Sequence, residues 1–246
     1  MTTSLARPAT RDGLFVWVMH RFAEVFEDHA VIKGGMALRL VDSPRLTTDI
    51  DYVFVPFASK KDIAARIREV LGEIDGADVQ LDLHSKMLRA ELRVDAASIQ
   101  IEANVARACE SVAMATGGFA RSVGQPSRIV RIQSPAHALT HKLAAWNERR
   151  LWRDLYDAYF LAVRAGAKPD LAVLDQRLAK IESRLPALRR RRRMTRAEFA
   201  EEVRLAVAGL TDDDLERELA GVLPPEELAG LALRIRAALV RLVERL

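Results

Sequence analysis

The chain has 246 residues, half of them hydrophobic and 29% charged, which is enough apolar material for one large or two small folded domains. Its net charge is +4 and its sequence pI is near 9.4. No stretch approaches the roughly 18 to 20 apolar residues that cross a bilayer, and the polar N-terminus contains Pro8 where a signal peptide would have an apolar core. We therefore expect a cytoplasmic protein with no membrane partner. A single cysteine, Cys109, excludes an internal disulfide and a cysteine-rich zinc site.

The N-terminal half mixes predicted helices and strands. Apolar residues recur at helical spacing over 12–28, which predicts an amphipathic helix that faces the core. The elements predicted after it are, in chain order, a helix over 36–41, a turn over 42–44, a strand over 52–55, a helix over 60–71, and strands near 78–84, 87–94, 98–105 and 128–132. Gly117 and Gly118 predict a loop between the last two strands.

After Pro135 the sequence becomes almost wholly helical. Helices are predicted over 135–147 and 148–165, and prolines divide most of the remainder into short helices. The last stretch, 226–246, alternates leucine-rich and arginine-rich faces and is predicted as one amphipathic helix. The sequence therefore predicts an α/β (α+β) protein with a mixed sheet and flanking helices over 1–133 and a helical C-terminal domain over 134–246.

A glycine turn followed by paired carboxylates is the most informative local pattern. Gly34 and Gly35 allow backbone N–H groups to approach a phosphate without a Cβ in the way. Asp49 and Asp51 stand two apart at the start of a strand, so both carboxylates project from one face and can share a divalent metal. The pattern Asp-x-Asp alone is more often a polar strand edge or a turn. The combination favours phosphoryl or nucleotidyl transfer.

Two segments resemble the AbiEii/AbiGii toxin family of nucleotidyltransferases, within the DNA polymerase β-like superfamily. The first segment is Lys-Gly-Gly-x-Ala-Leu-Arg followed by Arg-x-Thr-Thr-Asp-Ile-Asp, which runs from Lys33 to Asp51. The second is Lys-Leu-Ala-Ala from Lys142, then Arg149 with the arginine after it, then Arg-Asp-Leu-Tyr-Asp over 153–157. The resemblance implies a nucleotidyltransferase-type sheet that carries the metal site, with the helical half completing the cleft.

The resemblance also implies roles for single residues. A bound Mg²⁺ or Mn²⁺ is expected at Asp49 and Asp51, and Lys142 is expected to neutralise triphosphate charge. The residues expected to bind the nucleotide are Lys33, Gly34, Gly35, Arg45, Thr47, Thr48, Lys142 and Arg153.

Glu102 is the candidate for a third metal ligand. Superfamily members generally use a third carboxylate on a neighbouring strand, and the alternation over 98–105 predicts such a strand. Many relatives carry aspartate there, and Glu91 and Asp95 on the preceding strand are weaker candidates. A solvated strand face is the alternative for any of these carboxylates.

Asp154 and Asp157 stand three apart and are predicted to share one helical face. We expect one of them to orient Lys142 and the other to assist deprotonation of an acceptor hydroxyl. The alternative is that this segment forms only an ion-pair and capping network that docks the helices.

An unbroken run of five arginines stands out in the C-terminal half. Such a run must be solvated or bound to phosphate, and RNA is the commonest polyanion in a cytoplasm. We therefore predict RNA binding by this run, with a charged linker as the alternative. Its members are Arg189, Arg190, Arg191, Arg192 and Arg193.

Together these features predict a metal-dependent nucleotidyltransferase that transfers a nucleoside monophosphate from an NTP and releases pyrophosphate. The family resemblance implies an RNA acceptor, the 3′ end of a tRNA, and a toxin of a toxin–antitoxin or phage-defence system with a cognate antitoxin. A protein side chain or a small molecule such as an antibiotic is an alternative acceptor. A non-catalytic nucleic-acid-binding module is a further alternative.

Overall fold

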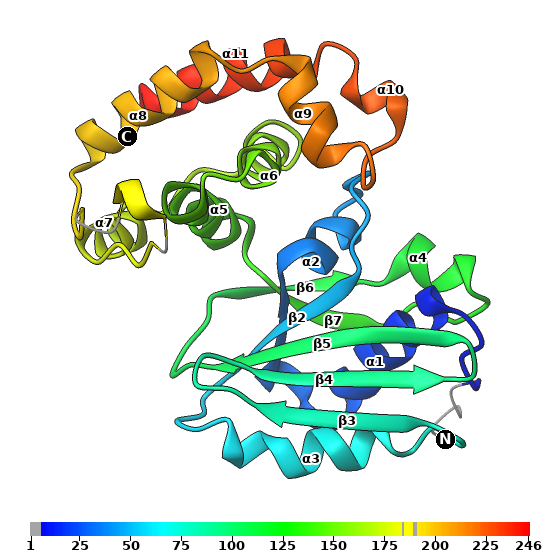
Figure 1. Cartoon of the computed structure of the whole chain (residues 1–246). Helices are drawn as coiled ribbons and strands as arrows, with labels where there is room; N and C mark the ends of the chain where they lie inside the picture. Colours follow the sequence, from blue (N-terminus) through cyan, green and yellow to red (C-terminus); the bar gives the residue numbers. More distant parts are fainter. Residues whose placement is uncertain (1–5, 184, 189–190) are drawn as a thin grey trace. The chain divides into compact units, whose positions relative to one another are not determined.

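The computed structural model describes residues 6–183, 185–188 and 191–246, and the chain folds into two compact units (Figure 1). The first unit comprises Met1–Asp42 and Thr47–Gln133, and the second comprises Ser43–Leu46 and Ser134–Leu246. The chain therefore passes between the units after Asp42, after Leu46 and after Gln133. Within the described residues, no helix has both the length and the apolar character needed to span a membrane.

A seven-stranded sheet with the order β3-β4-β5-β2-β1-β7-β6 forms the centre of the first unit (Figure 1). Its strands are β1 (Ala30–Lys33), β2 (Asp49–Phe54), β3 (Asp78–Leu83), β4 (Leu88–Val94), β5 (Ala97–Val105), β6 (Ser111–Ala115) and β7 (Ile129–Gln133). Strand β2 runs parallel to β5, and β1 runs parallel to β7, whereas the other neighbours are antiparallel. The predicted mixed sheet is confirmed.

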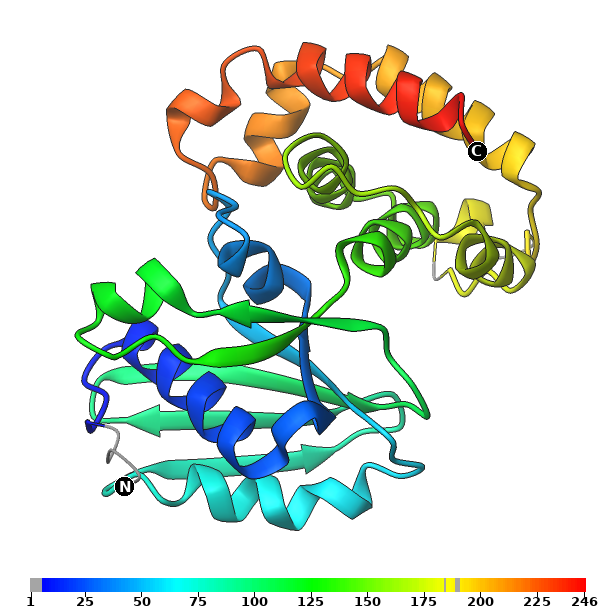
Figure 2. The same ribbon diagram turned by 180° about the vertical axis from the view of Figure 1, so that it is seen from behind.

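Helices α1 (Arg11–Phe26) and α3 (Lys61–Leu71) pack on one face of this sheet (Figure 2). Along β4, buried apolar residues alternate with the exposed side chains of Arg89, Glu91 and Arg93, as the period of two in a strand requires. The apolar side of the sheet joins the buried stripe of α1 in a single core. Polar side chains are therefore left on the other face, which carries the paired carboxylates.

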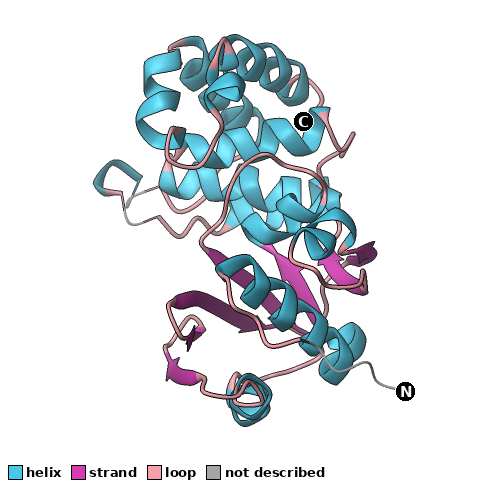
Figure 3. Cartoon of the chain, turned by 90° about the vertical axis from the view of Figure 1, so that its right-hand side faces the viewer, coloured by secondary structure: helices cyan, strands magenta, loops and turns pink. Residues whose placement is uncertain are grey.

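The second unit is helical in its described parts (Figure 3). Its helices are α5 (Pro135–Arg149), α6 (Trp152–Val163), α7 (Leu171–Ala179), α8 (Arg196–Ala208), α9 (Asp212–Leu219), α10 (Pro225–Leu228) and α11 (Leu231–Val243). Side-chain caps fix several of their starts: Ser134 caps α5, Asp170 caps α7, and Thr195 and Thr211 form capping boxes at α8 and α9. Trp146 of α5 packs edge-on against Phe199 of α8.

Some predicted elements were wrong or missed. The expected loop at Gly117 and Gly118 is the start of helix α4 (Gly117–Ser122). Strands β1 and β6 were missed, because β1 has only four residues and β6 is an edge strand with little apolar alternation. The segment 226–246 is two helices rather than one, since Gly230 adopts a left-handed φ of 64° between α10 and α11.

His20 of α1 is a buried polar group in the core of the first unit. Its Nε2 lies 2.8 Å from the Thr116 hydroxyl, and its Nδ1 has no hydrogen-bond partner among the described residues. Burial, assisted by the nearby Arg128 guanidinium and opposed by Glu24, lowers the pKa of His20 to about 4. His20 is therefore neutral in the folded protein at pH 7.

This pKa predicts a specific loss of stability in acid. Between pH 6.5 and 4 the unfolded chain protonates His20 and the folded chain does not, so the free energy of unfolding should fall by up to about 3 kcal/mol as pH drops through that window. Denaturant unfolding at several pH values should show this slope in the wild type and a shallower one in His20→Gln. Equal slopes in both proteins would contradict the assignment.

Candidate active site

The paired carboxylates lie on β2, where the neighbouring strands supply both a third carboxylate and flanking cations. Asp51 is directly opposite Lys33 of β1 on one side and Glu102 of β5 on the other. Glu102 is in turn opposite Arg89 of β4. Because residues directly opposite each other point to the same face, these four side chains form a row across the sheet, which we call the carboxylate row. Asp49 lies two residues before Asp51, on the same face.

Lys33 contacts one oxygen of Asp51, and Gly34 leaves the space that the other oxygen occupies. The Lys33 Nζ lies 3.3 Å from Asp51 Oδ1. Gly34 has a φ of 66°, and a Cβ built on it would lie 2.2 Å from Asp51 Oδ2. Glycine is therefore required at position 34 both for its backbone conformation and for the close approach of the carboxylate. Gly35, the next residue, is buried in the first turn of α2 (Gly34–Leu40).

The two threonines of the motif play different structural parts. The Thr47 hydroxyl lies 2.8 Å from the Asp49 carboxylate and 3.1 Å from the carbonyl oxygen of Asp49, so it fixes the Asp49 side chain. The side chain of Thr48 is exposed, and its carbonyl oxygen accepts a hydrogen bond from Arg11. Thr47 is thus a contact of the carboxylate itself, whereas Thr48 lies on the surface beside it.

Glu102 is held in the carboxylate row by two donors. Its Oε1 accepts hydrogen bonds from Arg89 and from Gln100, both at 2.8 Å. Neither contact involves Oε2. Asp49, Asp51 and Glu102 thus place carboxylate oxygens, the donor type that Mg²⁺ and Mn²⁺ prefer, on one face of two adjacent strands. Glu91 is two residues from Arg89 and is exposed, and Asp95 pairs with Arg7, so neither belongs to this row.

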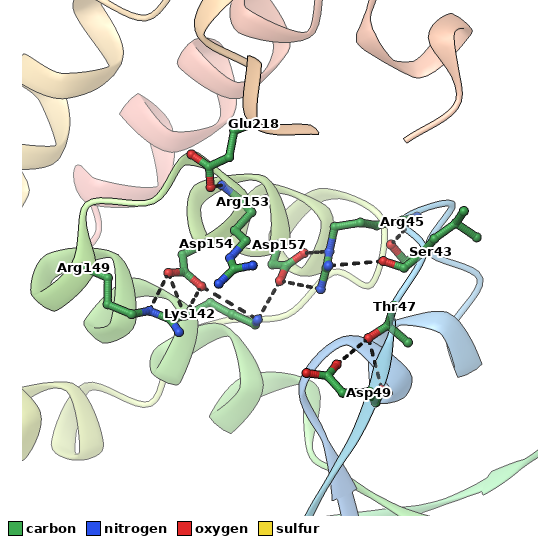
Figure 4. A network of polar contacts seen from close by, with 11 residues as sticks. Ser43, Arg45, Thr47, Asp49, Lys142, Arg149, Arg153, Asp154, Asp157 and Glu218 are labelled. Atoms are coloured by element: carbon green, nitrogen blue, oxygen red, sulfur yellow. Dashed lines mark hydrogen bonds and ion pairs between the residues drawn. The ribbon is translucent and has the colours of Figure 1, made fainter. Parts of the chain in front are cut away.

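A second group of charged residues lies in the helical unit, around Lys142 of α5 (Figure 4). Lys142 Nζ lies 2.6 Å from Asp157 and 3.9 Å from Asp154, both on α6. Arg45 donates two hydrogen bonds to Asp157, at 2.8 and 3.2 Å, and Arg149 donates to both oxygens of Asp154 at 2.6 to 3.1 Å. We call these five residues the buried charge network, since neither carboxylate has exposed surface.

The charges in this network do not cancel. Each aspartate has its own bidentate arginine, so the ammonium group of Lys142 is the surplus positive charge. Burial raises the pKa of Asp154, while Lys142 and Arg149 oppose that shift. The side chain of Lys142 retains 18% of its exposure, so it can reach a ligand from the solvent side. A buried cluster with one surplus positive charge suits an anion such as a phosphate.

The first turn of α6 is fixed by a carboxylate from another helix. Glu218 of α9 accepts hydrogen bonds from the backbone N–H groups of Trp152 at 2.9 Å and Arg153 at 3.1 Å (Figure 4). This interaction satisfies donors that a helix N-terminus otherwise leaves free. The Arg153 side chain itself is exposed and extends toward Asp154 and Lys142 in Figure 4.

The structure places the members of the arginine run differently from one another. Arg191 pairs with Glu198 and Glu202 of α8, which is an intramolecular role. Arg192 and Arg193 have exposed side chains. Arg189 and Arg190 lie outside the described residues.

Sequence reasoning missed the roles of three residues at these sites. Arg149 stood in the second motif but had no partner assigned, and Arg89 and Glu218 belong to no motif. The strand alternation that identified Glu102 could have shown that Arg89 shares its face. No local signal marks Glu218, because its contact with α6 spans more than sixty residues of chain.

A mixed sheet with carboxylates of neighbouring strands on its polar face is the arrangement expected of a nucleotidyltransferase. A family model described as "Nucleotidyl transferase AbiEii toxin, Type IV TA system" matches residues 17–238. The chain therefore belongs to the AbiEii family, and it is a nucleotidyltransferase toxin of a type IV toxin–antitoxin system.

Solved structures share the fold. The chain is similar to MenT4, a nucleotidyltransferase toxin from Mycobacterium tuberculosis H37Rv, with a TM-score of 0.63 and 17% identity over 96% of this chain and 83% of that one. It is also similar to JHP933 from Helicobacter pylori, with a TM-score of 0.55 and 16% identity over 96% of this chain and 90% of that one. No curated protein sequence matches it.

The close approach of Gly34 to Asp51 predicts the effect of a single methyl group. Gly34→Ala should displace the Asp51 carboxylate and lower the affinity for Mn²⁺ about 10-fold or more, measured by calorimetric titration. Gly124→Ala is the matched control, because Gly124 also has a left-handed φ, of 71°, but has open space around it. Both variants introduce about 1–2 kcal/mol of backbone strain, so only the close approach to Asp51 distinguishes them. Wild-type metal affinity in Gly34→Ala would contradict that close approach.

The surplus charge of the network predicts an asymmetry in stability. Lys142→Met leaves both aspartates with their bidentate arginines, so the free energy of unfolding should fall by less than in Arg45→Met. Arg45→Met removes two hydrogen bonds from a fully buried carboxylate, leaves it with Lys142 alone, and should cost about 3–5 kcal/mol. Denaturant unfolding of the two variants tests this, and equal losses would contradict the larger role of Arg45 in holding Asp157.

Proposed function

We propose that this toxin transfers a nucleoside monophosphate from an NTP to RNA, namely the 3′ end of a tRNA, and releases pyrophosphate. The observation that carries the proposal is the carboxylate row, in which Asp51 and Glu102 are direct neighbours on parallel strands and Asp49 shares their face. Three carboxylates so placed repel one another unless cations lie among them, and Lys33 and Arg89 at the two ends offset only part of that charge.

Asp49, Asp51 and Glu102 are the residues that would hold Mg²⁺ or Mn²⁺. When bound, the metal supplies Lewis-acid stabilisation of the triphosphate and activation of the attacking hydroxyl. Thr47 keeps the Asp49 side chain in one orientation, Lys33 contacts Asp51, and Gly34 leaves room for the Asp51 carboxylate. Gln100 and Arg89 orient Glu102.

We assign the nucleotide phosphates to backbone N–H groups and cationic side chains. The N–H groups around Gly34 and Gly35, with Thr48 and Lys33, serve the phosphates beside the metal. Lys142 supplies the surplus ammonium charge, and the exposed guanidinium of Arg153 supplies a second cation. Asp157 and Asp154 hold Lys142 from one side, which supports an orienting role for both aspartates. With no exposed surface, neither is well placed to accept a proton from a substrate hydroxyl.

An RNA acceptor is supported by the distribution of basic residues. The positive excess of the chain lies in the helical unit, which contains the whole arginine run. Arg192, Arg193 and Arg153 present exposed guanidinium groups, which suit phosphates of a nucleic acid. Membership of a type IV toxin–antitoxin family further implies an antitoxin partner, and we propose that the toxin acts in the cytoplasm.

Transfer of label tests the function and its acceptor together. The protein is incubated with Mg²⁺, each α-labelled NTP in turn, and total cellular RNA plus protein. We expect label on RNA of tRNA size with one preferred nucleotide, and Asp49→Ala and Asp51→Ala should each reduce it about 10³-fold or more. Asp78→Ala, an exposed carboxylate on β3 outside the carboxylate row, should keep full activity.

Other outcomes of the same assay would overturn parts of the proposal. Label on protein alone would make the acceptor a side chain. Label on neither, with pyrophosphate still released when aminoglycosides are added, would indicate a small-molecule acceptor. Retained activity in Asp49→Ala and Asp51→Ala would reject the assigned metal ligands.

A further inference from the structure

Residues Ser43–Leu46 form a strap that connects the metal carboxylates to the buried charge network. The strap follows α2 and precedes β2, which are both elements of the first unit, yet it belongs to the second unit. The last residue of the strap, Leu46, directly precedes Thr47. The Thr47 hydroxyl contacts the Asp49 carboxylate. The sequence predicted a turn over 42–44 here and a nucleotide-binding role for Arg45.

Residues of the helical unit hydrogen-bond with the side chains of Ser43 and Arg45 and with the backbone of Leu46. The backbone N–H of Leu46 donates to the carbonyl oxygen of Val222 at 2.8 Å. Arg45 is bound to both oxygens of Asp157, and its side chain retains only 10% exposure. Ser43 is buried and hydrogen-bonds with the hydroxyl of Tyr156, whose pKa is raised to about 12, mainly by burial.

The guanidinium of Arg45 is committed to Asp157 and to the strap itself. Its Nε and one Nη bind the carboxylate, and the other Nη lies 3.3 Å from the carbonyl oxygen of Leu46. A buried bidentate pair of this kind is strong and geometrically specific. If Arg45 bound a phosphate instead of Asp157, the Asp157 carboxylate would keep only Lys142 as its partner.

We propose that Arg45 is a positioning residue that orients Asp49 through the strap, and not a ligand of the nucleotide. Arg45 fixes the strap to Asp157, the strap places Thr47, and Thr47 fixes the Asp49 carboxylate. The same Asp157 carboxylate holds Lys142 at 2.6 Å. Asp157 therefore positions Lys142 directly. Through Arg45 and the four residues of chain that follow it, Asp157 also positions Asp49, a proposed metal ligand. The inference rests on the proposed metal role of Asp49.

The test measures metal affinity without nucleotide, by calorimetric titration of Mn²⁺ into the full chain. Arg45→Gln should weaken Mn²⁺ binding about 10-fold, the loss typical of a residue that supports a metal ligand. Asp157→Asn cuts the same interaction from the other end and should weaken it to a similar extent. Arg45→Lys keeps the charge but not the bidentate geometry and should fall between wild type and Arg45→Gln.

Arg149→Gln is the matched control. It cuts the neighbouring arginine–aspartate pair of the same network, at Asp154, but touches no strap residue. We expect Mn²⁺ affinity within about twofold of wild type, since the side chain lies outside the chain of contacts to Asp49.

A second readout needs no metal. Hydrogen exchange of the Leu46 amide reports whether the strap is anchored, because that N–H is bonded to Val222 in the wild type. Its protection should be lost in Arg45→Gln and Asp157→Asn and kept in Arg149→Gln. Thermal unfolding of each variant shows at which temperatures it is folded, and hydrogen exchange is measured at such a temperature. If Arg45→Gln does not fold, Arg45→Lys and Thr47→Val, which cuts the strap from Asp49, carry the test.

The outcomes separate this inference from the proposed function. A folded Arg45→Gln with wild-type Mn²⁺ affinity and weaker NTP binding would make Arg45 a phosphate ligand and reject the strap. Equal losses in Arg45→Gln and Arg149→Gln would also reject it. A wild-type protein that binds no Mn²⁺ and transfers no label would instead refute the proposed function.

Discussion

Two aspartates without exposed surface, Asp154 and Asp157, are the constraint on which the helical unit depends. A carboxylate removed from water costs several kcal/mol unless cations and hydrogen bonds replace its hydration. Each aspartate meets that requirement with a bidentate arginine, and Lys142 is then surplus to charge balance. The geometry of the lysine is thus a consequence of how the helices neutralise their own buried charge. The positive charge available to a phosphate is what remains after that neutralisation.

The sheet solves a similar problem in a different way. Neighbouring strands lie roughly 4.8 Å apart, so opposing carboxylates such as Asp51 and Glu102 repel one another on an open face. Lys33 and Arg89 sit at the ends of the row and offset part of that repulsion, without burying the carboxylates. The row therefore keeps carboxylate oxygens that are still able to bind a cation, whereas the buried network has none to spare. The carboxylates of the sheet suit metal binding, and those of the helices suit positioning.

The sequence was informative where one local pattern sufficed. Period-two alternation predicted β4 and β5 and gave Glu102 the correct face, and the glycine pair with Asp49 and Asp51 marked the carboxylate row. It was uninformative where a partner lies far along the chain. Arg45 and Asp157 are 112 residues apart, and nothing near Arg45 shows that its charge is committed to a buried aspartate. Residues 42–44 carry ordinary turn chemistry, so the sequence could not show that the chain enters the other unit there.

The strap also changes how closely the two groups of residues are connected. Along the chain, Asp49 and Lys142 are separated by more than ninety residues. The contact between Arg45 and Asp157 bypasses most of that length, because Arg45 is only four residues from Asp49, a span of at most about 14 Å when fully extended. The buried ion pair thus shortens the path along bonded and contacting residues between these groups from a long segment to four residues of chain. For that reason the arginine before the Thr-Thr-Asp-Ile-Asp segment belongs functionally to the metal carboxylates, although its charge is used in the helical unit.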